Sequence, residues 1–438
     1  MTRLSVVPRL ALFAALVAGC ATAPPEIAEI APAEVPCPKG PPEGARCLRG
    51  QDSAGAHYLI VLPAQWNQVL VVHAHGGPVL GTPTTKRADE DIARWAITVK
   101  AGYAYAASVF RQGGVAARSA AEDTERVRRI FVKHVEAPKR TILHGQSWGA
   151  SVAAKAAEMY PRSFDGVLLT SGVLGGAASY DFRIDLRVVY QYVCRNHPRP
   201  DEPQYPLWMG LPKDAKLTRA QLAARVEECL GSAKPGAKRT PEQARRLKTI
   251  ADVIRIPEAN VLGHLNWATW HFQDIVQNRT GGRNPFGNTG VVYSGSPDDA
   301  ALNAGVERYR ADPAAAATFA GDMNPTGRID VPVLTAHAIH DPIAFVELES
   351  AFRQVMEAAG SAPRLVQVFT DHKAHSYFAD PVYPALFAAL LKWVEAGEKP
   401  TPAGIARDCK ALESRYGAPC GFVPDYEVGP LESRVPRR

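Results

Sequence analysis

Residues 140–160 read RTILHGQSWGASVAAKAAEMY, and this stretch decides the fold. Its first five residues form a short apolar run, which predicts a buried strand. Small residues fill positions 150–160 and Pro161 closes the run, as expected for a helix. Between them Gly145 and Gly149 flank Ser147, so the backbone can turn sharply and expose the serine hydroxyl above a sheet edge. The stretch predicts a nucleophilic Ser147; the alternative is a turn serine that merely caps the helix.

Other short apolar runs bounded by Gly, Pro or charged residues predict further buried strands. They cover residues 57–62, 69–73, 103–110, 166–170, 331–336 and 365–369. Between two of them, residues 122–134 carry apolar side chains at helical spacing. Alternation of strands and helices predicts a mostly parallel sheet with helices on both faces.

The alternation stops between residues 177 and 330, where the sequence becomes irregular and aromatic. A segment of this length is too long for a loop, so we expect a large inserted cap over the carboxyl ends of the strands. Trp267, Trp270 and His271 share one helical face of it and either line an acyl or aryl pocket or pack the cap together. Four acids are candidate partners of a substrate amine, or else solvated surface: Asp181, Asp185, Asp201 and Glu202.

A glycine pair follows the predicted strand 69–73, within Ala74-His75-Gly76-Gly77-Pro78. Such a pair just past a strand end lets backbone N–H groups face a substrate oxygen without obstruction. We expect the N–H groups of Gly77 and Trp148 to form an oxyanion hole, with Gly76 as the alternative to Gly77. We expect His75 to orient this loop through hydrogen bonds rather than to transfer a proton.

A nucleophilic serine also needs an acid–base partner, and the order Ser, Asp or Glu, His is typical of a serine on a strand–turn–helix. Asp341 lies just after the predicted strand 331–336, at the end of the sheet where active-site loops gather. Glu347 and Glu349 compete with it, but we expect both on the following helix, facing solvent. Asp341 is therefore the predicted acid.

The predicted base follows the last strand, where His372 and His375 are available. We prefer His375 because it lies deeper in the loop, just before the terminal helix. In that case His372 is a supporting or merely polar loop residue. The predicted catalytic residues are Ser147, Asp341 and His375.

Four motifs in this order resemble the α/β-hydrolase family: His75-Gly76-Gly77-Pro78, Gly145-Gln146-Ser147-Trp148-Gly149, Asp341-Pro342 and His375-Ser376-Tyr377-Phe378. The resemblance spans residues 57–397 without the cap and implies the α/β-hydrolase fold. Within the family, the first, second and fourth motifs are similar to serine aminopeptidases of the proline iminopeptidase type. The chain has Val79 where those peptidases have a further glycine.

The motifs favour a serine hydrolase that cleaves a small-molecule carboxylic ester without a cofactor. An aminopeptidase or amidase is the second reading and an acyltransferase the third. A catalytically silent envelope binding lipoprotein is the alternative of another class, because a fold alone does not define a function. Neither a C-x-x-C nor an H-E-x-x-H motif occurs, so we expect no metal site. The net charge of +6 comes without a clustered basic patch, so we expect no nucleic-acid partner.

The first residues predict export. Arg3 and Arg9 precede the apolar run 10–17, which is too short to span a bilayer but has the size of a signal-peptide core. Val17-Ala18-Gly19-Cys20 resembles the lipobox of bacterial lipoproteins, in which the cysteine is diacylated; the alternative is an ordinary signal peptide. We therefore expect a signal peptide at residues 1–19 and a tether at 20–50. The protein would be anchored at the bacterial cell envelope, on its periplasmic or extracellular side, and touch the membrane only through its N-terminal lipid.

The cysteines other than Cys20 are even in number, as expected for disulfides in an oxidising compartment. Of the fifteen formal pairings we expect the three that are local in sequence: Cys37 with Cys47, Cys194 with Cys229, and Cys409 with Cys420. The predicted domain organisation is a catalytic core at residues 51–176 and 331–398, the cap at 177–330, and a stapled C-terminal strap at 399–438.

Overall fold

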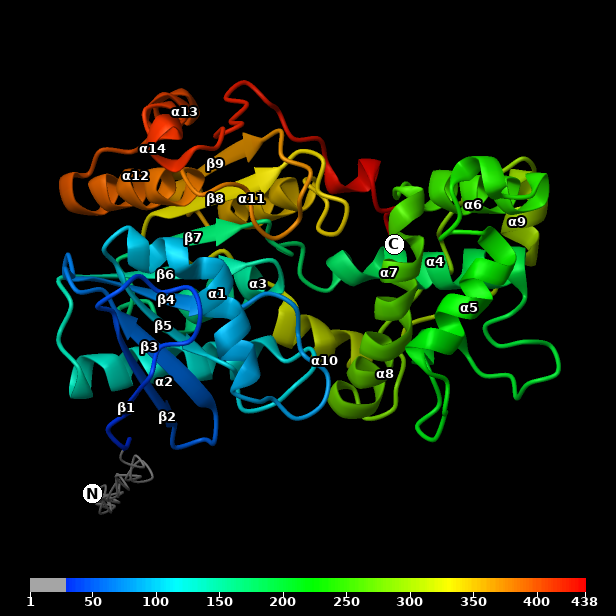
Figure 1. Ribbon diagram of the computed structural model, residues 1–438. Coiled ribbons are helices and arrows are strands. Elements are labelled where there is room, and N and C mark those ends of the chain that lie inside the picture. The colour runs from blue at the N-terminus through cyan, green and yellow to red at the C-terminus, as the bar shows by residue number, and fades with distance from the viewer. Residues whose placement is uncertain (1–28) are drawn as a thin grey trace, which may run out of the picture.

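A nine-stranded sheet forms the centre of the computed structural model, which describes residues 29–438 (Figure 1). The strand order is β1-β2-β3-β5-β4-β6-β7-β8-β9. The bounds are β1 Ala33–Val35, β2 Arg46–Gln51, β3 His57–Leu62, β4 Val69–Ala74, β5 Ala104–Ser108, β6 Arg140–Gln146, β7 Gly166–Thr170, β8 Val333–Ala338 and β9 Leu365–Thr370. Neighbouring strands from β5 to β9 are parallel, whereas β1, β2 and β3 pair antiparallel and β3 also runs antiparallel to β5.

Helices cover both faces of this sheet. One face carries α1 (Lys86–Lys100), α12 (Val382–Ala396) and α13 (Pro402–Lys410), and the other carries α2 (Ala117–His134), α3 (Trp148–Met159) and α11 (Leu348–Ala358). Side chains of β4 alternate between the two layers, since Leu70 and Val72 join the core of the second group and Val69 and Val71 that of the first. This strand order, in which an antiparallel β3 borders a parallel sheet with helices on both faces, is that of the α/β-hydrolase fold, as the sequence predicts.

All seven predicted strands are present; β3 and β7 have the predicted ends, and the ends of the other five are shifted by one or two residues. The predicted helix 122–134 is α2, which begins five residues earlier at Ala117. The carboxylate of Asp322 accepts hydrogen bonds from the N–H groups of Ala117 (2.8 Å) and Arg118 (3.0 Å) at this end. Because this acid is about 200 positions away in the sequence, helical periodicity alone could not locate the start.

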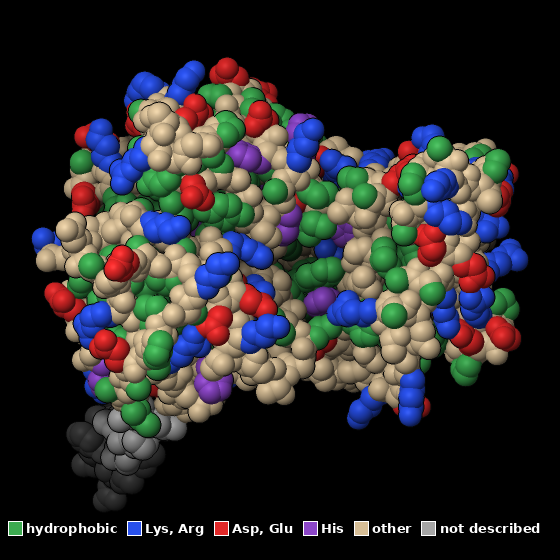
Figure 2. Space-filling view, in the orientation of Figure 1, with side chains coloured by type: hydrophobic (Ala, Val, Ile, Leu, Met, Phe, Trp, Pro, Cys, Tyr) green, Lys and Arg blue, Asp and Glu red, His purple; other side chains and the backbone are tan. Residues whose placement is uncertain are grey.

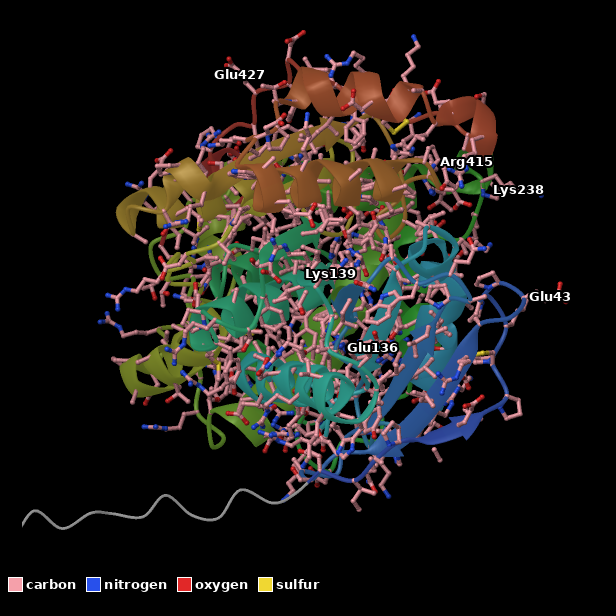
Figure 3. All side chains as sticks on the ribbon, turned by 90° about the vertical axis from the view of Figure 1, so that its left-hand side faces the viewer. Glu43, Glu136, Lys139, Lys238, Arg415 and Glu427 are labelled. Atoms are coloured by element: carbon pink, nitrogen blue, oxygen red, sulfur yellow. A yellow bond between two sulfur atoms is a disulfide. The ribbon has the colours of Figure 1, made fainter. Side chains whose placement is uncertain are left out.

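The predicted tether at residues 20–50 is wrong in its second half. Residues 33–35 and 46–51 form β1 and β2, which extend the sheet beyond β3. Cys37 and Cys47 form a disulfide at this edge, and Val35 lies opposite Cys47 in the strand register. Because a disulfide holds this edge of the sheet, its strands need few apolar residues, and their largely polar sequence does not show the apolar pattern that predicts a strand. Figure 3 shows Glu43 projecting from the loop between these strands. The signal peptide and Cys20 lie outside the described residues.

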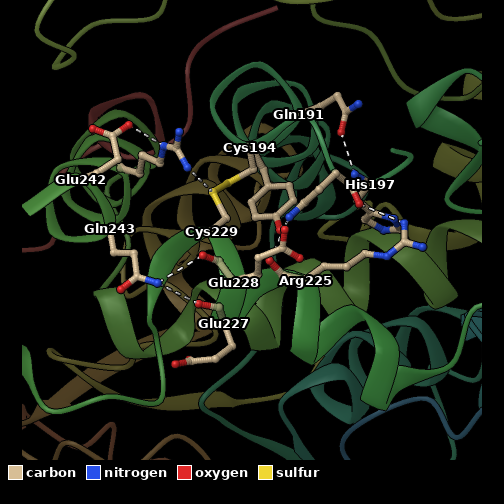
Figure 4. Close-up of a disulfide and its surroundings, with 12 residues drawn as sticks. Gln191, Cys194, His197, Arg225, Glu227, Glu228, Cys229, Glu242 and Gln243 are labelled. Atoms are coloured by element: carbon tan, nitrogen blue, oxygen red, sulfur yellow. Dashed lines mark hydrogen bonds and ion pairs between the residues drawn. A yellow bond between two sulfur atoms is a disulfide. The ribbon is translucent and has the colours of Figure 1, made fainter. Parts of the chain in front are cut away.

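A helical insertion, residues 171–332, separates β7 from β8 and lies to one side of the sheet (Figure 1). Its helices are α4 Ala178–Cys194, α5 Arg219–Leu230, α6 Pro241–Ile254, α7 Val261–Asn266, α8 Phe272–Asp274, α9 Asp299–Gly305 and α10 Pro313–Met323. The Cys194–Cys229 disulfide joins α4 to α5, and the Gln243 amide of α6 donates to the carbonyls of Glu227 and Glu228 (Figure 4). The insertion thus has covalent and polar links between its own helices.

The C-terminal segment runs from the sheet back to the insertion (Figure 1). After α13 it forms α14 (Glu413–Tyr416) and the Cys409–Cys420 disulfide, and it then crosses to α4, where Arg438 pairs with Asp185 at 2.8 Å. All three disulfides are the local pairs that the sequence predicts. Within residues 29–438, no helix combines the length and apolar character needed to cross a membrane.

Candidate active site

Ser147 lies at the turn between β6 and α3. Its backbone has φ 57° and ψ −124°, a conformation that non-glycine residues rarely adopt and that the surroundings must enforce. The Ser147 N–H donates to the Thr170 carbonyl at 2.9 Å. A methyl group at Gly149 would lie 2.1 Å from the carbonyl oxygen of Ala74, and one at Gly145 would lie 2.4 Å from that of Gly149. Both flanking glycines are therefore required by close backbone approach.

The side chains of the three predicted catalytic residues meet in one hydrogen-bonded series. Ser147 Oγ lies 2.7 Å from His375 Nε2, and His375 Nδ1 lies 2.7 Å from Asp341 Oδ2. The other Asp341 oxygen accepts hydrogen bonds from the N–H groups of Ile343 (2.8 Å) and Ala344 (3.0 Å). Because β6, β8 and β9 are parallel, the loops after them reach the same edge of the sheet and bring these residues together.

His372, the competing histidine, lies outside this series. Its ring packs against Phe378, with centroids 5.6 Å apart, and burial lowers its pKa. The structure therefore separates the two histidines by contact: His375 reaches Ser147, whereas His372 supports the loop.

The glycine loop after β4 lies against Ser147. A methyl group at Gly76 would lie 3.0 Å from Ser147 Cβ, whereas one at Gly77, which has φ 68°, would meet open space. The Gly76 carbonyl accepts a hydrogen bond from Arg87 Nη2 at 2.5 Å, a contact from α1 that sequence reasoning missed. Trp148 is the first residue of α3, and the first N–H groups of a helix have no acceptor within it.

His75 belongs to the same loop but is sealed from solvent. Its ring stacks on Phe110 with centroids 4.3 Å apart, and Nδ1 lies 3.2 Å from the Gly76 carbonyl. Burial lowers the pKa of His75 to about 3, so the imidazole is neutral near neutral pH. A neutral packed ring is suited to holding the loop.

A second buried series of polar groups lies behind Asp341, and sequence reasoning misjudged it. The expectation that Glu349 faces solvent is wrong, because this side chain is fully buried. Its carboxylate lies 3.0 Å from His337 Nδ1, accepts from the Thr335 hydroxyl at 2.6 Å and accepts from the Gln367 amide at 2.7 Å. The sequence did hold a signal for this burial. Thr335 and His337 occupy alternate positions of the otherwise apolar strand β8, and Gln367 lies opposite Thr335 on β9. Polar side chains on one face of a buried sheet need a buried polar partner, which here is Glu349. Glu347 instead pairs with Arg434 at 3.1 Å.

The geometry around His337 favours a protonated ring. Nδ1 faces the Glu349 carboxylate, and Nε2 lies 2.9 Å from the Ala344 carbonyl, so a ring that is protonated on both nitrogens finds an acceptor for each. Burial acts to lower the pKa of His337, but the hydrogen bond and charge of Glu349 and the charge of Asp341 outweigh it and raise the pKa. Nε2 of His337 also lies 3.6 Å from Asp341 Oδ2, so a protonated ring would offset part of the negative charge of Asp341.

Two histidines of the insertion contact the loops on either side of Ser147. His264 Nε2 lies 3.0 Å from the carbonyl of Pro342, directly after Asp341, and His271 Nε2 lies 3.2 Å from the carbonyl of Pro78. Burial lowers the pKa of both rings to about 3, so each is neutral and donates to its carbonyl. The insertion is thereby attached to both loops.

The cap aromatics do not all share one face. Trp267 stacks on His271 with ring centroids 3.7 Å apart, within a π-helical turn over Trp267–His271. Trp270 lies instead beneath Arg219, whose guanidinium carbon is 4.6 Å from its ring centroid. A π-helical turn holds more residues than an α-helical one, which separates positions that α-helical spacing would align. Figure 2 shows histidine and hydrophobic side chains in the hollow between the sheet core and the insertion.

The four acids considered for a substrate amine have other surroundings. Asp185 accepts from Arg438 and from the Tyr293 hydroxyl at 2.7 Å, and Asp181 lies 3.6 Å from Arg438. Glu202 is paired with Arg225, and Asp201 is exposed. Over residues 29–438, moreover, no group of three or more His, Cys, Asp or Glu side chains is arranged to hold a metal ion.

No protein-family model and no curated protein matches this sequence. Among solved structures, the chain is similar to an esterase from Aspergillus oryzae, at 13% identity and a TM-score of 0.46 over 81% of this chain and 80% of the other. It is also similar to feruloyl esterase B from Aspergillus oryzae (14%, 0.41, 81% and 81%) and to the rice cell wall degrading esterase LipA from Xanthomonas oryzae (11%, 0.37, 85% and 89%). The fold of this chain is established by its own strand order and directions.

Proposed function

We propose that this protein is a serine hydrolase that cleaves a small-molecule carboxylic ester through an acyl-serine intermediate. The proposal rests above all on the two 2.7 Å hydrogen bonds that join Ser147 to His375 and His375 to Asp341. A serine, an imidazole and a carboxylate in this order are the groups that such a reaction needs. The strained backbone of Ser147 adds support, because strain of this kind gathers at functional sites.

In the proposed reaction, Ser147 Oγ attacks the ester carbonyl carbon while His375 Nε2 takes the hydroxyl proton. Asp341 holds the ring and stabilises the imidazolium. The N–H groups of Gly77 and Trp148 are proposed to bind the carbonyl oxygen as it gains negative charge. The proton then passes to the departing alcohol oxygen as its bond to carbon breaks. Water repeats the sequence: His375 takes its proton, the oxygen attacks the acyl carbon, and Ser147 regains a proton as the acid leaves.

We favour an ester over the N-terminus of a peptide because of the charges in the insertion. An aminopeptidase must hold a protonated amine beside the scissile bond, and a buried ammonium needs a carboxylate partner. Asp181, Asp185 and Glu202 already have arginine partners. Using one of them for a substrate amine would require an existing ion pair to break.

We also propose that the protein works outside the cytoplasm, held to the cell envelope by a lipid on Cys20. The three disulfides support an oxidising compartment. A signal peptide with a lipobox accounts for the first twenty residues of the sequence.

Labelling with a fluorophosphonate probe tests the reaction class. The wild-type protein should be labelled and should hydrolyse short-chain or aryl esters, whereas Ser147→Ala should do neither. Ser151→Ala is a matched control, because this serine lies one turn along the same helix and its hydroxyl donates to the Val173 carbonyl. Labelling that persists in Ser147→Ala would assign the nucleophile to another residue and refute the proposed mechanism. An unlabelled wild type that hydrolyses no ester would instead favour the binding lipoprotein.

A further inference from the structure

Arg183 of α4 is a buried arginine surrounded by aromatic rings. Only 4% of the residue is exposed. Its guanidinium carbon lies 4.5 Å from the ring centroid of Phe182, 4.9 Å from that of Trp267 and 5.5 Å from that of Tyr180. Aromatic faces attract a cation but do not neutralise it.

No carboxylate of residues 29–438 pairs with this guanidinium. Its one hydrogen bond to a described residue runs from Nη1 to the Ser179 carbonyl at 2.9 Å, and Nε is buried without an acceptor. The edge formed by Nε and Nη2, which suits two parallel bonds to a carboxylate, is therefore free of acceptors from the described residues. Burial lowers the pKa of Arg183 to about 10, so it stays charged at neutral pH.

The aromatic neighbours of Arg183 connect it to both loops beside Ser147. Trp267 stacks on His271, which donates to the Pro78 carbonyl next to Gly77. On the other side, Phe182 packs against His264, with centroids 5.1 Å apart, and His264 donates to the carbonyl of Pro342. The guanidinium therefore belongs to the layer of the insertion that contacts the two loops of the candidate site.

We propose that Arg183 binds a carboxylate of the substrate, so that the preferred substrate is an anionic ester whose charge lies away from the scissile bond. This inference rests on the proposed ester hydrolysis at Ser147. A buried charge without a partner is strongly unfavourable, and a substrate carboxylate would supply the missing counter-ion. The fork of a guanidinium binds a carboxylate with two hydrogen bonds, and the surrounding rings exclude competing water.

Two matched pairs of esters test the proposal. Nitrophenyl hydrogen adipate and nitrophenyl hexanoate differ in a charged group on the acyl side, and carboxyphenyl hexanoate and phenyl hexanoate differ on the alcohol side. In at least one pair, the wild type should show kcat/KM about tenfold or more higher for the charged ester, a gap that one charged hydrogen-bonded contact can supply. Arg183→Leu should abolish this preference. The ratio compares two esters on one preparation, so partial misfolding does not change it.

Arg219→Leu is the matched control, because Arg219 also lies over a tryptophan of the insertion but is exposed. It should keep the wild-type ratio. The proposal is overturned if the wild type prefers the neutral ester in both pairs, or if Arg183→Leu keeps the charged-ester preference.

A binding measurement separates this proposal from the proposed reaction. Free adipate should raise the melting temperature of Ser147→Ala protein but not that of the Ser147→Ala, Arg183→Leu double variant. If no ester is hydrolysed and adipate still stabilises only the protein with Arg183, the ester hydrolase is refuted and the anion site stands. If esters are hydrolysed without a charge preference and adipate has no effect, the anion site is refuted and the hydrolase stands.

Discussion

Replacing Glu349 with Gln should destabilise the protein strongly and in a pH-dependent way. Glu349 and His337 are both fully buried and 3.0 Å apart, and the carboxylate has two further hydrogen-bond donors. Removing one partner of a buried ion pair leaves the other charge uncompensated and typically costs about 3–5 kcal/mol. The glutamine keeps the shape and can still accept hydrogen bonds, so we expect a loss of about 3 kcal/mol in the free energy of unfolding, at the lower end of that range.

The pH dependence follows from the raised pKa of His337. A group with a raised folded-state pKa gives its full stabilisation below its unfolded pKa of about 6.5 and loses it as the pH rises through the folded value. The difference in unfolding free energy between wild type and Glu349→Gln should therefore be largest near pH 6 and smaller near pH 9. Equilibrium urea unfolding with the disulfides intact, followed by tryptophan fluorescence, measures both values.

Glu347→Gln is the control on the same segment. Glu347 pairs with the part-exposed Arg434, so its loss should cost about 1 kcal/mol or less. A loss in Glu349→Gln no larger than in Glu347→Gln would show that the buried pair contributes little. A difference that grows toward alkaline pH would show that His337 is neutral in the folded protein and would refute the protonation argument.

Three further predictions concern the site and the anchor. Asp341→Asn should give a folded protein whose ester-hydrolysis kcat falls by up to about 10⁴-fold, because the His375 ring loses its orienting carboxylate; a loss below tenfold in steady-state assays would assign the acid role to another residue. His375→Ala should match Ser147→Ala in lost activity and His372→Ala should be far milder, and the reverse ranking would exchange their roles. Cys20→Ser should release the protein from the membrane fraction or block its processing, and a wild type that incorporates no labelled fatty acid would contradict the lipobox.

Residues whose role depends on local backbone could be predicted from the sequence. The Ser147 turn was predictable because the two glycines that allow it and the change from strand to helix all lie close to Ser147 in the sequence. Asp341 and His375 were predictable because each lies in the loop that follows a predicted strand. β1 and β2 were missed because a disulfide and strand pairing hold them, rather than an apolar pattern. Glu349 was missed because its burial depends on polar side chains of β8 and β9, which a helical pattern does not reveal.

The charges of α4 show how such long-range partners can still be inferred from a sequence. Acids and arginines alternate every second residue at Asp181, Arg183, Asp185 and Arg187. In a helix, positions four apart share a face and positions two apart lie on opposite sides, so like charges gather and the opposite charges cannot pair within the helix. Each face therefore needs partners from elsewhere. The acidic face receives Arg438 from a distant part of the sequence. On the basic face, neither arginine has a carboxylate among the described residues: Arg187 Nη2 lies 3.5 Å from the Gly210 carbonyl, and Arg183 Nη1 donates to the Ser179 carbonyl. The spacing that leaves the acids to an arginine from elsewhere thus also leaves Arg183 without a carboxylate inside its own helix, and the substrate carboxylate proposed above would supply one.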